Sequence, residues 1–373
     1  MRDIVVIGAG KIGSAIAAML AETGDYRVTV ADRDAAAAAE AARHPNVDSI
    51  GTDIRNEAGL RALLKGRHAV LSAAPFHLTT AIAEAAAASG VHYMDLTEDV
   101  ASTRRVMELA RGSATAFIPQ CGLAPGFISI VANDLAGRFD TLDTMRLRVG
   151  ALPEFPSNAL GYNLTWSTDG VINEYIEPCE AIVDGHKILV PAMQELETLS
   201  IDGTRYEAFN TSGGLGSLCE TYAGKVRSLN YRTLRYPGHA AIMKTLLDDL
   251  GLRHRREVLK DILEHALPAT RQDVVVTFAT VTGMRNGRLV QETDARRIHS
   301  GPIAGEMHSA IQITTAAGIC AVLDLLSAGI LPQKGFVRQE DVPFDAFLAN
   351  RFGSRYRRSS KADGASERLR DAA

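Results

Sequence analysis

Short apolar runs alternate with helix-forming segments over roughly the first 126 residues. The first run, residues 3–7, ends at a glycine and predicts a buried parallel strand. Further strands are expected at 26–32, 47–54, 68–74, 91–96 and 114–121, and helices at 12–23, 35–42, 57–64, 79–90 and 102–112. Regular alternation of strand and helix is typical of a doubly wound parallel sheet. We therefore expect an α/β fold whose first domain, residues 1–126, is a Rossmann domain.

The pattern changes after Gly126. A strand is expected at 143–152, several short strands without a regular helix at 179–234, and helices at 239–250 and 256–266. Residues 274–293 predict a hairpin, because Asn286-Gly287 is the residue pair that a two-residue turn prefers. The sequence therefore predicts a second, α+β domain at 127–304 with a largely antiparallel sheet.

The remaining residues divide into an apolar part and a polar part. Residues 308–330 predict a long apolar helix, and we expect about 305–353 to return to the first domain and complete it. Residues 354–373 lack an apolar period and are expected to form a polar tail.

Charge and composition exclude several classes of protein. The formal net charge is −4, so no overall basic field would attract nucleic acid or a membrane surface. The opening residues resemble a strand rather than a signal peptide, and no uninterrupted apolar stretch reaches the roughly 18 residues that a membrane helix needs. The four cysteines lie far apart, which argues against a metal site. We expect a cytoplasmic protein without a metal.

A glycine-rich motif follows the first predicted strand. Gly8, Gly10 and Gly13 form G-x-G-x-x-G, with Lys11 and Ile12 between the last two. In a Rossmann domain the first glycine permits the tight turn, the second lets the backbone approach a pyrophosphate, and the third lets helix and strand pack closely. The helix then offers its unpaired N–H groups to the phosphates. This context predicts a dinucleotide site.

Further residues extend the predicted dinucleotide site. Asp32 ends the second strand, where a carboxylate accepts from the ribose 2′-OH and repels a 2′-phosphate, so NAD is expected as cofactor. Arg33 complicates this preference, because a guanidinium could accommodate a phosphate or stack on adenine. Asp53 and Ile54 are candidates for contact with the adenine, with an ordinary loop as the alternative. Ala73-Ala74-Pro75 ends the fourth strand, where small residues allow close approach to the nicotinamide ribose.

Four strings in the second half carry a family resemblance: GLAPG (122–126), TWSTDGVINEY (165–175), TSGG (211–214) and TLRYPGH (233–239). Through them the chain resembles the saccharopine dehydrogenase-like superfamily and, within it, the lysine 6-dehydrogenases. The resemblance covers about residues 1–350. Saccharopine reductases and carboxynorspermidine dehydrogenases usually have aspartate inside the first string, where this chain has Ala124. That difference favours the lysine dehydrogenase pattern.

The resemblance implies an activity and an assembly. The activity is NAD-dependent oxidative deamination of the ε-amino group of L-lysine, whose product cyclises to Δ1-piperideine-6-carboxylate with release of ammonia and NADH. The second domain is expected to bind substrate and to mediate formation of a homodimer or homotetramer. Gly122 and Leu123, at the start of the first string, join the cofactor candidates.

Candidate substrate residues lie mostly within these strings. Arg235 is the first choice for the lysine carboxylate, since a guanidinium binds carboxylate through two hydrogen bonds; a structural ion pair is the alternative. Trp166 could wall the aliphatic chain or belong to the core. Further polar candidates are Asn163, Thr165, Ser167, Ser212 and Tyr236.

The general base is left open between Glu98, His239 and a bound water. Asp95, Glu98 and Asp99 follow the fifth strand and could hold an ammonium or act as a base, with helix capping as the alternative. The ε-nitrogen of lysine must lose its proton before hydride leaves, so an alkaline optimum is expected. The rival functions are a reductase acting on a secondary amine and a non-catalytic NAD sensor.

Overall fold

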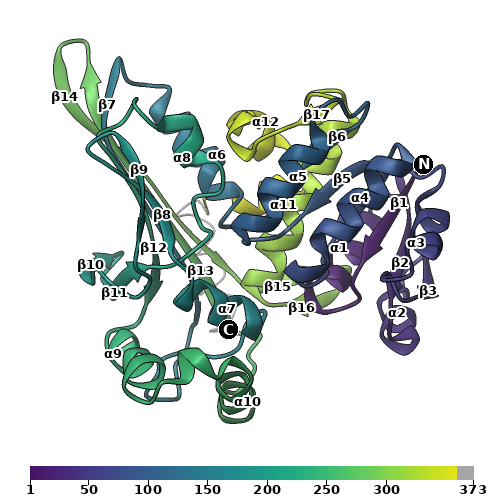
Figure 1. Cartoon of the computed structure of the whole chain (residues 1–373), viewed down its shortest axis with the longest axis horizontal. Helices are drawn as coiled ribbons and strands as arrows, with labels where there is room; N and C mark the ends of the chain where they lie inside the picture. The colour runs from purple at the N-terminus through teal and green to yellow at the C-terminus, as the bar shows by residue number, and fades with distance from the viewer. Residues whose placement is uncertain (359–373) are drawn as a thin grey trace, which may run out of the picture.

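A computed structural model describes residues 1–358 as two domains side by side (Figure 1). The first contains a seven-stranded parallel sheet of order β17-β6-β5-β4-β1-β2-β3. Its strands are β1 (Arg2–Ile7), β2 (Tyr26–Asp32), β3 (Val47–Gly51), β4 (Ala69–Ser72), β5 (His92–Asp95), β6 (Ala116–Ile118) and β17 (Gly335–Phe336). The Rossmann-type α/β fold expected from the sequence is confirmed.

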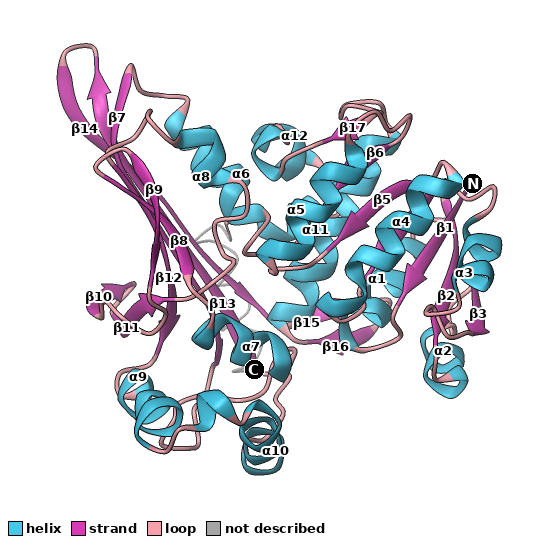
Figure 2. Ribbon diagram, in the orientation of Figure 1, coloured by secondary structure: helices cyan, strands magenta, loops and turns pink. Residues whose placement is uncertain are grey.

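Helices cover both faces of this sheet (Figure 2). Alternate residues of β1 point to opposite faces: Ile4 and Val6 pack with α1 and α11, whereas Val5 and Ile7 pack with α3, α4 and α5. The helices are α1 (Lys11–Ala21), α2 (Ala35–Ala41), α3 (Glu57–Leu64), α4 (Thr79–Ser89), α5 (Val100–Ala110) and α11 (Ala310–Ser327). Strands apolar on both sides therefore form the centre of the domain.

The C-terminal part of the described chain returns to the first sheet. Helix α11 packs against α1, and the short strand β17 pairs with β6 in parallel. Helix α12 (Phe344–Ala349) follows beside α11 and α6 (Phe127–Ala136). By length and composition α11 could cross a membrane, but 78% of it is buried within the fold, as in the core helix of a globular domain. Most of the predicted polar tail lies outside the described residues.

The second domain is an eight-stranded mixed sheet of order β10-β11-β12-β7-β13-β14, with β8 and β9 extending from β12. The strands are β7 (Thr141–Pro153), β8 (Cys179–Val183), β9 (His186–Val190), β10 (Glu197–Ile201), β11 (Thr204–Asn210), β12 (Ser228–Arg235), β13 (Asp273–Arg285) and β14 (Arg288–His299). The β13–β14 hairpin turns at Asn286 and Gly287, both with positive φ, as predicted. A small hairpin of β15 (Gly301–Ile303) and β16 (Glu306–His308) leads into α11.

Helix α6 packs against β7 and β13 of the second sheet. The described part of the second domain also contains α7 (Thr168–Ile176), α8 (Leu218–Tyr222), α9 (His239–Lys244) and α10 (Arg256–Ala266). The sequence pattern did not predict α7, because its nine residues are too short to show a helical period; Ser167 caps it by accepting from the Gly170 N–H. The short α8 also interrupts the region expected to contain strands alone. Beyond α9 the expected helix continues as a short π-helix at Thr245–Asp249.

An ionic cluster attaches the C-terminal segment to the first sheet. The carboxylate of Asp324 on α11 accepts hydrogen bonds from Tyr26 Oη at 2.6 Å, Asn350 Nδ2 at 2.8 Å and Arg351 Nη2 at 2.7 Å. Burial opposes ionisation, but these donors hold the pKa of Asp324 below its ordinary 3.8. The ionised carboxylate therefore stabilises the return of the chain.

We predict that Asp324→Asn lowers the free energy of unfolding by about 2 kcal/mol at neutral pH, because three donors lose a charged acceptor. For a chain of this size that is a fall in Tm of about 2–3 °C in a thermal melt. A depressed folded-state pKa gives stability that is present above pH 3.8 and is lost as pH falls through the folded-state pKa, so the difference should shrink progressively below pH 3.8. The exposed Asp48→Asn, which lies outside this cluster, serves as control and should change Tm much less; equal Tm values for Asp324→Asn and the parent at pH 7 would contradict the assignment.

Candidate active site

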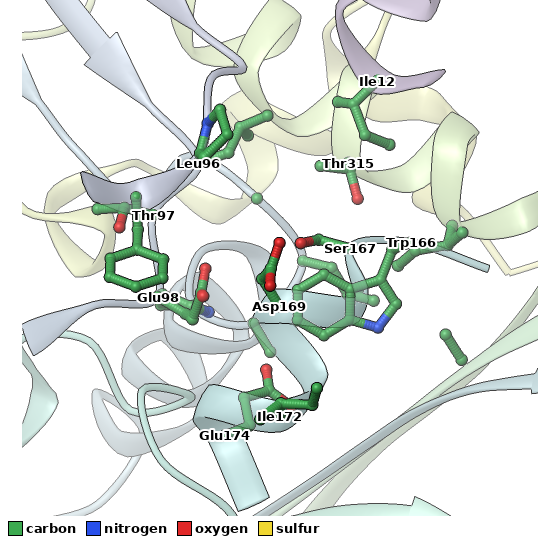
Figure 3. A pocket seen from close by; sticks show the side chains of 18 of the residues that line it. Ile12, Leu96, Thr97, Glu98, Trp166, Ser167, Asp169, Ile172, Glu174 and Thr315 are labelled. Atoms are coloured by element: carbon green, nitrogen blue, oxygen red, sulfur yellow. The ribbon is translucent and has the colours of Figure 1, made fainter. Parts of the chain in front are cut away.

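A cavity of about 520 Å³ lies between the two domains (Figure 3). The first domain contributes the first turn of α1, the loops after β4, β5 and β6, and the N-terminal turns of α11, and the second contributes β7, β12, α7 and α10. Ligands of open α/β sheets bind at the carboxyl ends of the strands, which is where the first domain meets this cavity. Ten residues singled out from the sequence line it: Ile12, Ala73, Ala74, Pro75, Glu98, Gly122, Leu123, Trp166, Ser167 and Arg235.

The glycine motif has the geometry of a dinucleotide-binding turn. Gly8 has φ +103°, and a Cβ there would lie 2.7 Å from the Ala73 carbonyl oxygen. A Cβ on Gly13 would lie 1.8 Å from the Gly8 oxygen, so helix and strand could not pack. A Cβ on Gly10 would meet nothing within 4 Å, and no side chain caps α1 at this terminus. The space beside Gly10 and the first N–H groups of α1 are therefore available to a phosphate pair.

Asp32 braces the glycine loop from the end of β2. Its Oδ2 accepts from the Ala9 N–H at 2.7 Å and its Oδ1 from the Asp34 N–H at 2.9 Å. Each carboxylate oxygen can accept a second hydrogen bond, so the residue fits a ribose hydroxyl. The neighbouring Arg33 and, on α1, Lys11 are exposed.

The two candidates after β3 are placed differently from Asp32. Ile54 is buried in the apolar cluster beneath α3 and α4, so it is core and not a surface for adenine, which corrects that expectation. Asp53 is exposed and paired with Arg55, whose guanidinium donates hydrogen bonds that lower the pKa of Asp53 to about 2. Ordinary loop structure accounts for both.

Arg235 forms a nearly complete anion site in the second domain. It is 3% exposed; its Nε donates to Tyr175 Oη at 2.8 Å, and its Nη1 donates to Thr233 Oγ1 and the Leu234 carbonyl. Its Cζ lies 4.8 Å from the centre of the Tyr162 ring. Within residues 1–358, Nη2 has no hydrogen-bond partner, although the residue lines the cavity. A buried guanidinium with one free nitrogen is a site for a carboxylate.

His239 lies behind this site, outside the cavity, which corrects its expected role as a base. Its Nδ1 bonds the Leu160 carbonyl at 2.9 Å, and its Nε2 lies 3.0 Å from Tyr175 Oη. Burial, together with the Arg235 charge, lowers the pKa of His239 to about 3, so the ring is neutral. Since Nδ1 carries the proton, Nε2 accepts from Tyr175, whose oxygen in turn accepts from Arg235. The histidine positions the tyrosine and, through it, the guanidinium.

Most other polar candidates from the sequence are engaged within the protein and do not line the cavity. Asn163 accepts from Asn158 Nδ2, Ser212 donates to the Pro178 carbonyl, and Tyr236 donates to the Pro153 carbonyl. Thr165 is buried beside Trp166. These residues support the walls of the cavity, whereas Trp166 and Ser167 face it.

The TSGG string also acts indirectly. A Cβ on Gly213 would lie 2.5 Å from the Glu98 carbonyl oxygen, and one on Gly214 would lie 2.3 Å from the Tyr231 ring. Gly213 therefore lets the second domain pack directly against the loop that carries Glu98, whereas Gly214 lets the string pack against β12 of its own domain. This contact is one between domains, which a glycine-rich string does not reveal by itself.

The acidic residues after β5 separate into structural and cavity-lining groups. Asp95 accepts from Tyr93 Oη, the Thr97 N–H and the Gln120 N–H, and it does not line the cavity, which corrects its proposed role as a ligand. Asp99 caps α5 by accepting from the Ser102 N–H at 2.7 Å. Glu98 alone of the three faces the cavity.

The sequence reasoning missed Glu174. This residue of α7 is 7% exposed, lines the cavity and lies below Glu98 and Trp166 in the view of Figure 3. Burial raises the pKa of Glu98 to about 7, and burial together with the charge of Glu98 raises the pKa of Glu174 to about 8. An acidic residue within the otherwise buried string VINEY was the available signal, because carboxylates are rarely buried without a partner.

Two family models together cover most of the chain. The "Saccharopine dehydrogenase NADP binding domain" matches residues 4–116, and the "Saccharopine dehydrogenase C-terminal domain" matches residues 122–354. The resemblance seen in the four strings is therefore confirmed at the level of the family.

Curated relatives agree with this assignment. The mitochondrial alpha-aminoadipic semialdehyde synthase of Mus musculus is 20% identical over 301 residues, which is 75% of this chain and 31% of that protein. The synthase of Bos taurus is 19% identical over 310 residues, covering 80% of this chain and 33% of that protein. The chain thus spans about a third of the length of these relatives.

A solved structure shares the fold. Apo histidine-tagged saccharopine dehydrogenase (L-Glu forming) from Saccharomyces cerevisiae superposes with a TM-score of 0.78 at 17% identity, over 94% of this chain and 96% of that chain. The likeness shows a shared fold, and the two family models place the chain, whose first domain contains the dinucleotide-binding turn, in the saccharopine dehydrogenase family.

Proposed function

We propose that the protein catalyses NAD-dependent oxidative deamination of the ε-amino group of L-lysine. The 6-semialdehyde that forms closes on the α-amine to give Δ1-piperideine-6-carboxylate. The observation that carries the proposal is Arg235, a buried guanidinium with a free Nη2 in a cavity that opens on the dinucleotide-binding loops. An amino-acid carboxylate bound there would extend its side chain toward Ala73 and Gly122, where the nicotinamide is expected.

The rest of the cavity suits the chemistry of an amine. A bound nicotinamide supplies the hydride acceptor. Trp166 and Ile172 offer apolar surface to methylene groups, and Glu98 and Glu174 offer carboxyl groups to a cationic nitrogen. Hydride leaves the ε-carbon only when the ε-nitrogen is neutral, so a carboxylate must first accept a proton from the ammonium. Water then attacks the imine and ammonia leaves.

The relatives support an amine substrate without fixing which one. Their names refer to saccharopine and to alpha-aminoadipic semialdehyde, compounds related to lysine. Ala124, which lines the cavity where saccharopine reductases usually have aspartate, favours lysine over a secondary amine. We further propose NAD as the preferred cofactor, because Asp32 presents a carboxylate where NADP would place its 2′-phosphate.

Two glycine substitutions separate folding from cofactor binding. We predict that Gly10→Ala keeps the parent Tm but weakens NADH binding at least tenfold, because its Cβ enters only the space reserved for the pyrophosphate. Gly13→Ala should lower Tm by several degrees, since its Cβ collides with the Gly8 carbonyl. Fluorescence titration with NADH and a thermal melt measure both effects. Unchanged NADH affinity in Gly10→Ala would refute the placement of the phosphates.

A charge change tests the cofactor preference. Asp32→Asn should reduce the ratio of NAD to NADP affinity about tenfold, by removing the charge that opposes the 2′-phosphate, while Arg33 stays available to it. Asp34→Asn removes a charge two residues away and keeps a good helix cap, so it should leave the ratio unchanged. Titrations with both cofactors provide the ratio, and a parent enzyme that prefers NADP would overturn the proposal.

The activity is tested by NAD reduction with lysine, ornithine, saccharopine and polyamines as substrates. We expect turnover with L-lysine and release of ammonia. Addition of 2-oxoglutarate with lysine and NADH should cause no NADH consumption, whereas a saccharopine-forming reductase would consume it. Tight cofactor binding without turnover of any amine would indicate the NAD sensor instead.

The carboxylate anchor is tested in the same assay. Arg235→Lys should raise KM for L-lysine about 10–100-fold with a smaller change in kcat, because one point charge replaces a planar pair of donors. Arg296→Lys, another buried arginine that lies outside the cavity, should leave KM near the parent value. An unchanged KM in Arg235→Lys would remove Arg235 from the site.

A further inference from the structure

We propose that Glu98 and Glu174 form a coupled acid–base pair that binds the amine cation of the substrate and accepts its proton. This inference deepens the proposed function by naming the group that prepares the nitrogen for hydride transfer. It replaces the open choice between Glu98, His239 and water with two carboxyls, one from each domain.

The two carboxyls face one space without being neutralised there. Glu174 is more than nine-tenths buried on α7, and its carboxylate has no hydrogen-bond donor among residues 1–358, a costly arrangement unless a ligand completes it. Glu98 approaches from the loop between β5 and α5, and Gly213 holds that loop against the second domain. Figure 3 shows both side chains among those that line the cavity, with Asp169 between Glu98 and Trp166 in this view.

The charged neighbours leave the pair short of positive charge. Arg235 faces Glu174 but donates to Tyr175, Thr233 and the backbone, with Nη2 assigned to the substrate carboxylate. Asp95 and Asp99 add negative charge behind Glu98.

The basic side chains at the mouth are already paired. On α10, Lys260 pairs with Asp169 and Arg256 with Glu177, and Glu257 adds a further negative charge. His77 also lines the rim and is exposed, so it does not neutralise the buried pair. A ligand with a positively charged nitrogen is therefore the complement that this space lacks.

The ionisation of the pair suits proton transfer from an amine. Burial raises the pKa of Glu98 to about 7, and the charge on Glu98 adds to burial in raising the pKa of Glu174 to about 8. The pKa of an ordinary glutamate is about six units below that of a lysine ammonium, whereas the pKa values of this pair are about three units below it. The equilibrium for proton transfer is therefore more favourable by about a thousandfold.

The proton and charge balance of the step is complete. The ε-ammonium gives one proton to the ionised pair, forming one carboxylic acid and a neutral amine. The C–H bond at the ε-carbon then breaks, and its hydrogen, with both bonding electrons, would go as hydride to a bound NAD⁺, leaving an iminium on the substrate. Water adds to the iminium carbon, the C–N bond breaks to give the aldehyde and an ammonium ion, and the carboxylic acid returns its proton to the solvent.

Titration of the free protein tests the pair without any substrate. With ¹³C-labelled glutamate side chains, we expect two carboxyl resonances to titrate near pH 7 and pH 8. Glu174→Gln should remove the resonance that titrates near pH 8. Glu98→Gln should lower the titration midpoint of that resonance by at least half a pH unit, because the negative charge of Glu98 is gone. Glu340→Gln removes a buried carboxyl outside the cavity and should leave both resonances in place. Titration of both cavity glutamates near pH 4.5 would overturn the proposal.

Kinetics then test the role in turnover. In the parent, kcat/KM for L-lysine should rise as pH increases through 7–8, because the ionised pair is the active form. Glu174→Gln should lower kcat by a factor of about 10²–10⁴ with unchanged NADH affinity. Full kcat in that variant would overturn the catalytic role. If the parent titrates as expected but oxidises no amine, the proposed function fails while the carboxyl pair stands, so the two failures are distinguishable.

Discussion

A single buried guanidinium organises the inner half of the second domain. Arg235 ends β12, and the groups that satisfy it come from α7 and from β12 itself, while His239 at the start of α9 fixes the tyrosine between them. Burial of a cation is tolerated only when hydrogen bonds and aromatic faces compensate for lost water. Because Nη2 has no hydrogen-bond partner among residues 1–358, Arg235 both supports the fold and offers one nitrogen to a ligand. The apolar cluster around Tyr175, Phe209 and Met243 packs against it.

Both domains supply charged groups to the site. Glu98 belongs to the nucleotide-binding domain, whereas Glu174 and Arg235 belong to the other, and Gly213 allows the close contact between the second domain and the Glu98 loop. Buried carboxyls with raised pKa values lower folding stability as pH rises, since the unfolded chain ionises them more readily. The protein therefore gives up some stability at the pH where the pair is ionised and active. Lower folding stability is expected where activity requires a buried polar group without a hydrogen-bond partner.

Local sequence patterns were sufficient to predict the fold of the first domain and its dinucleotide-binding turn, but not all the residues that line the cavity. The glycine motif and Asp32 could be interpreted from sequence because their geometry depends on one strand, one turn and one helix. The position of Glu174 could not be predicted in this way, because this residue is buried only when β12, the Glu98 loop and α10 pack around the short helix α7. His239 and Asp95 were misassigned for the same reason: sequence shows that a group can ionise, but only the tertiary contacts show which donors and acceptors already occupy it. Ile54 follows a strand as adenine contacts do, yet its side chain points inward to α3.

Because α11 lies late in the chain, the first sheet stays incomplete for much of the time that the protein is being synthesised. About 170 residues separate α6 from α11, which a ribosome adds in about 10–35 s. During that interval the face of the first sheet that carries Ile4 and Val6 has α1 but lacks α11, and β6 has an open edge where β17 will pair. The nascent nucleotide-binding region is thus exposed to aggregation and to chaperones until the last tenth of the protein emerges. The packing of the first domain is completed only after the second domain has been made.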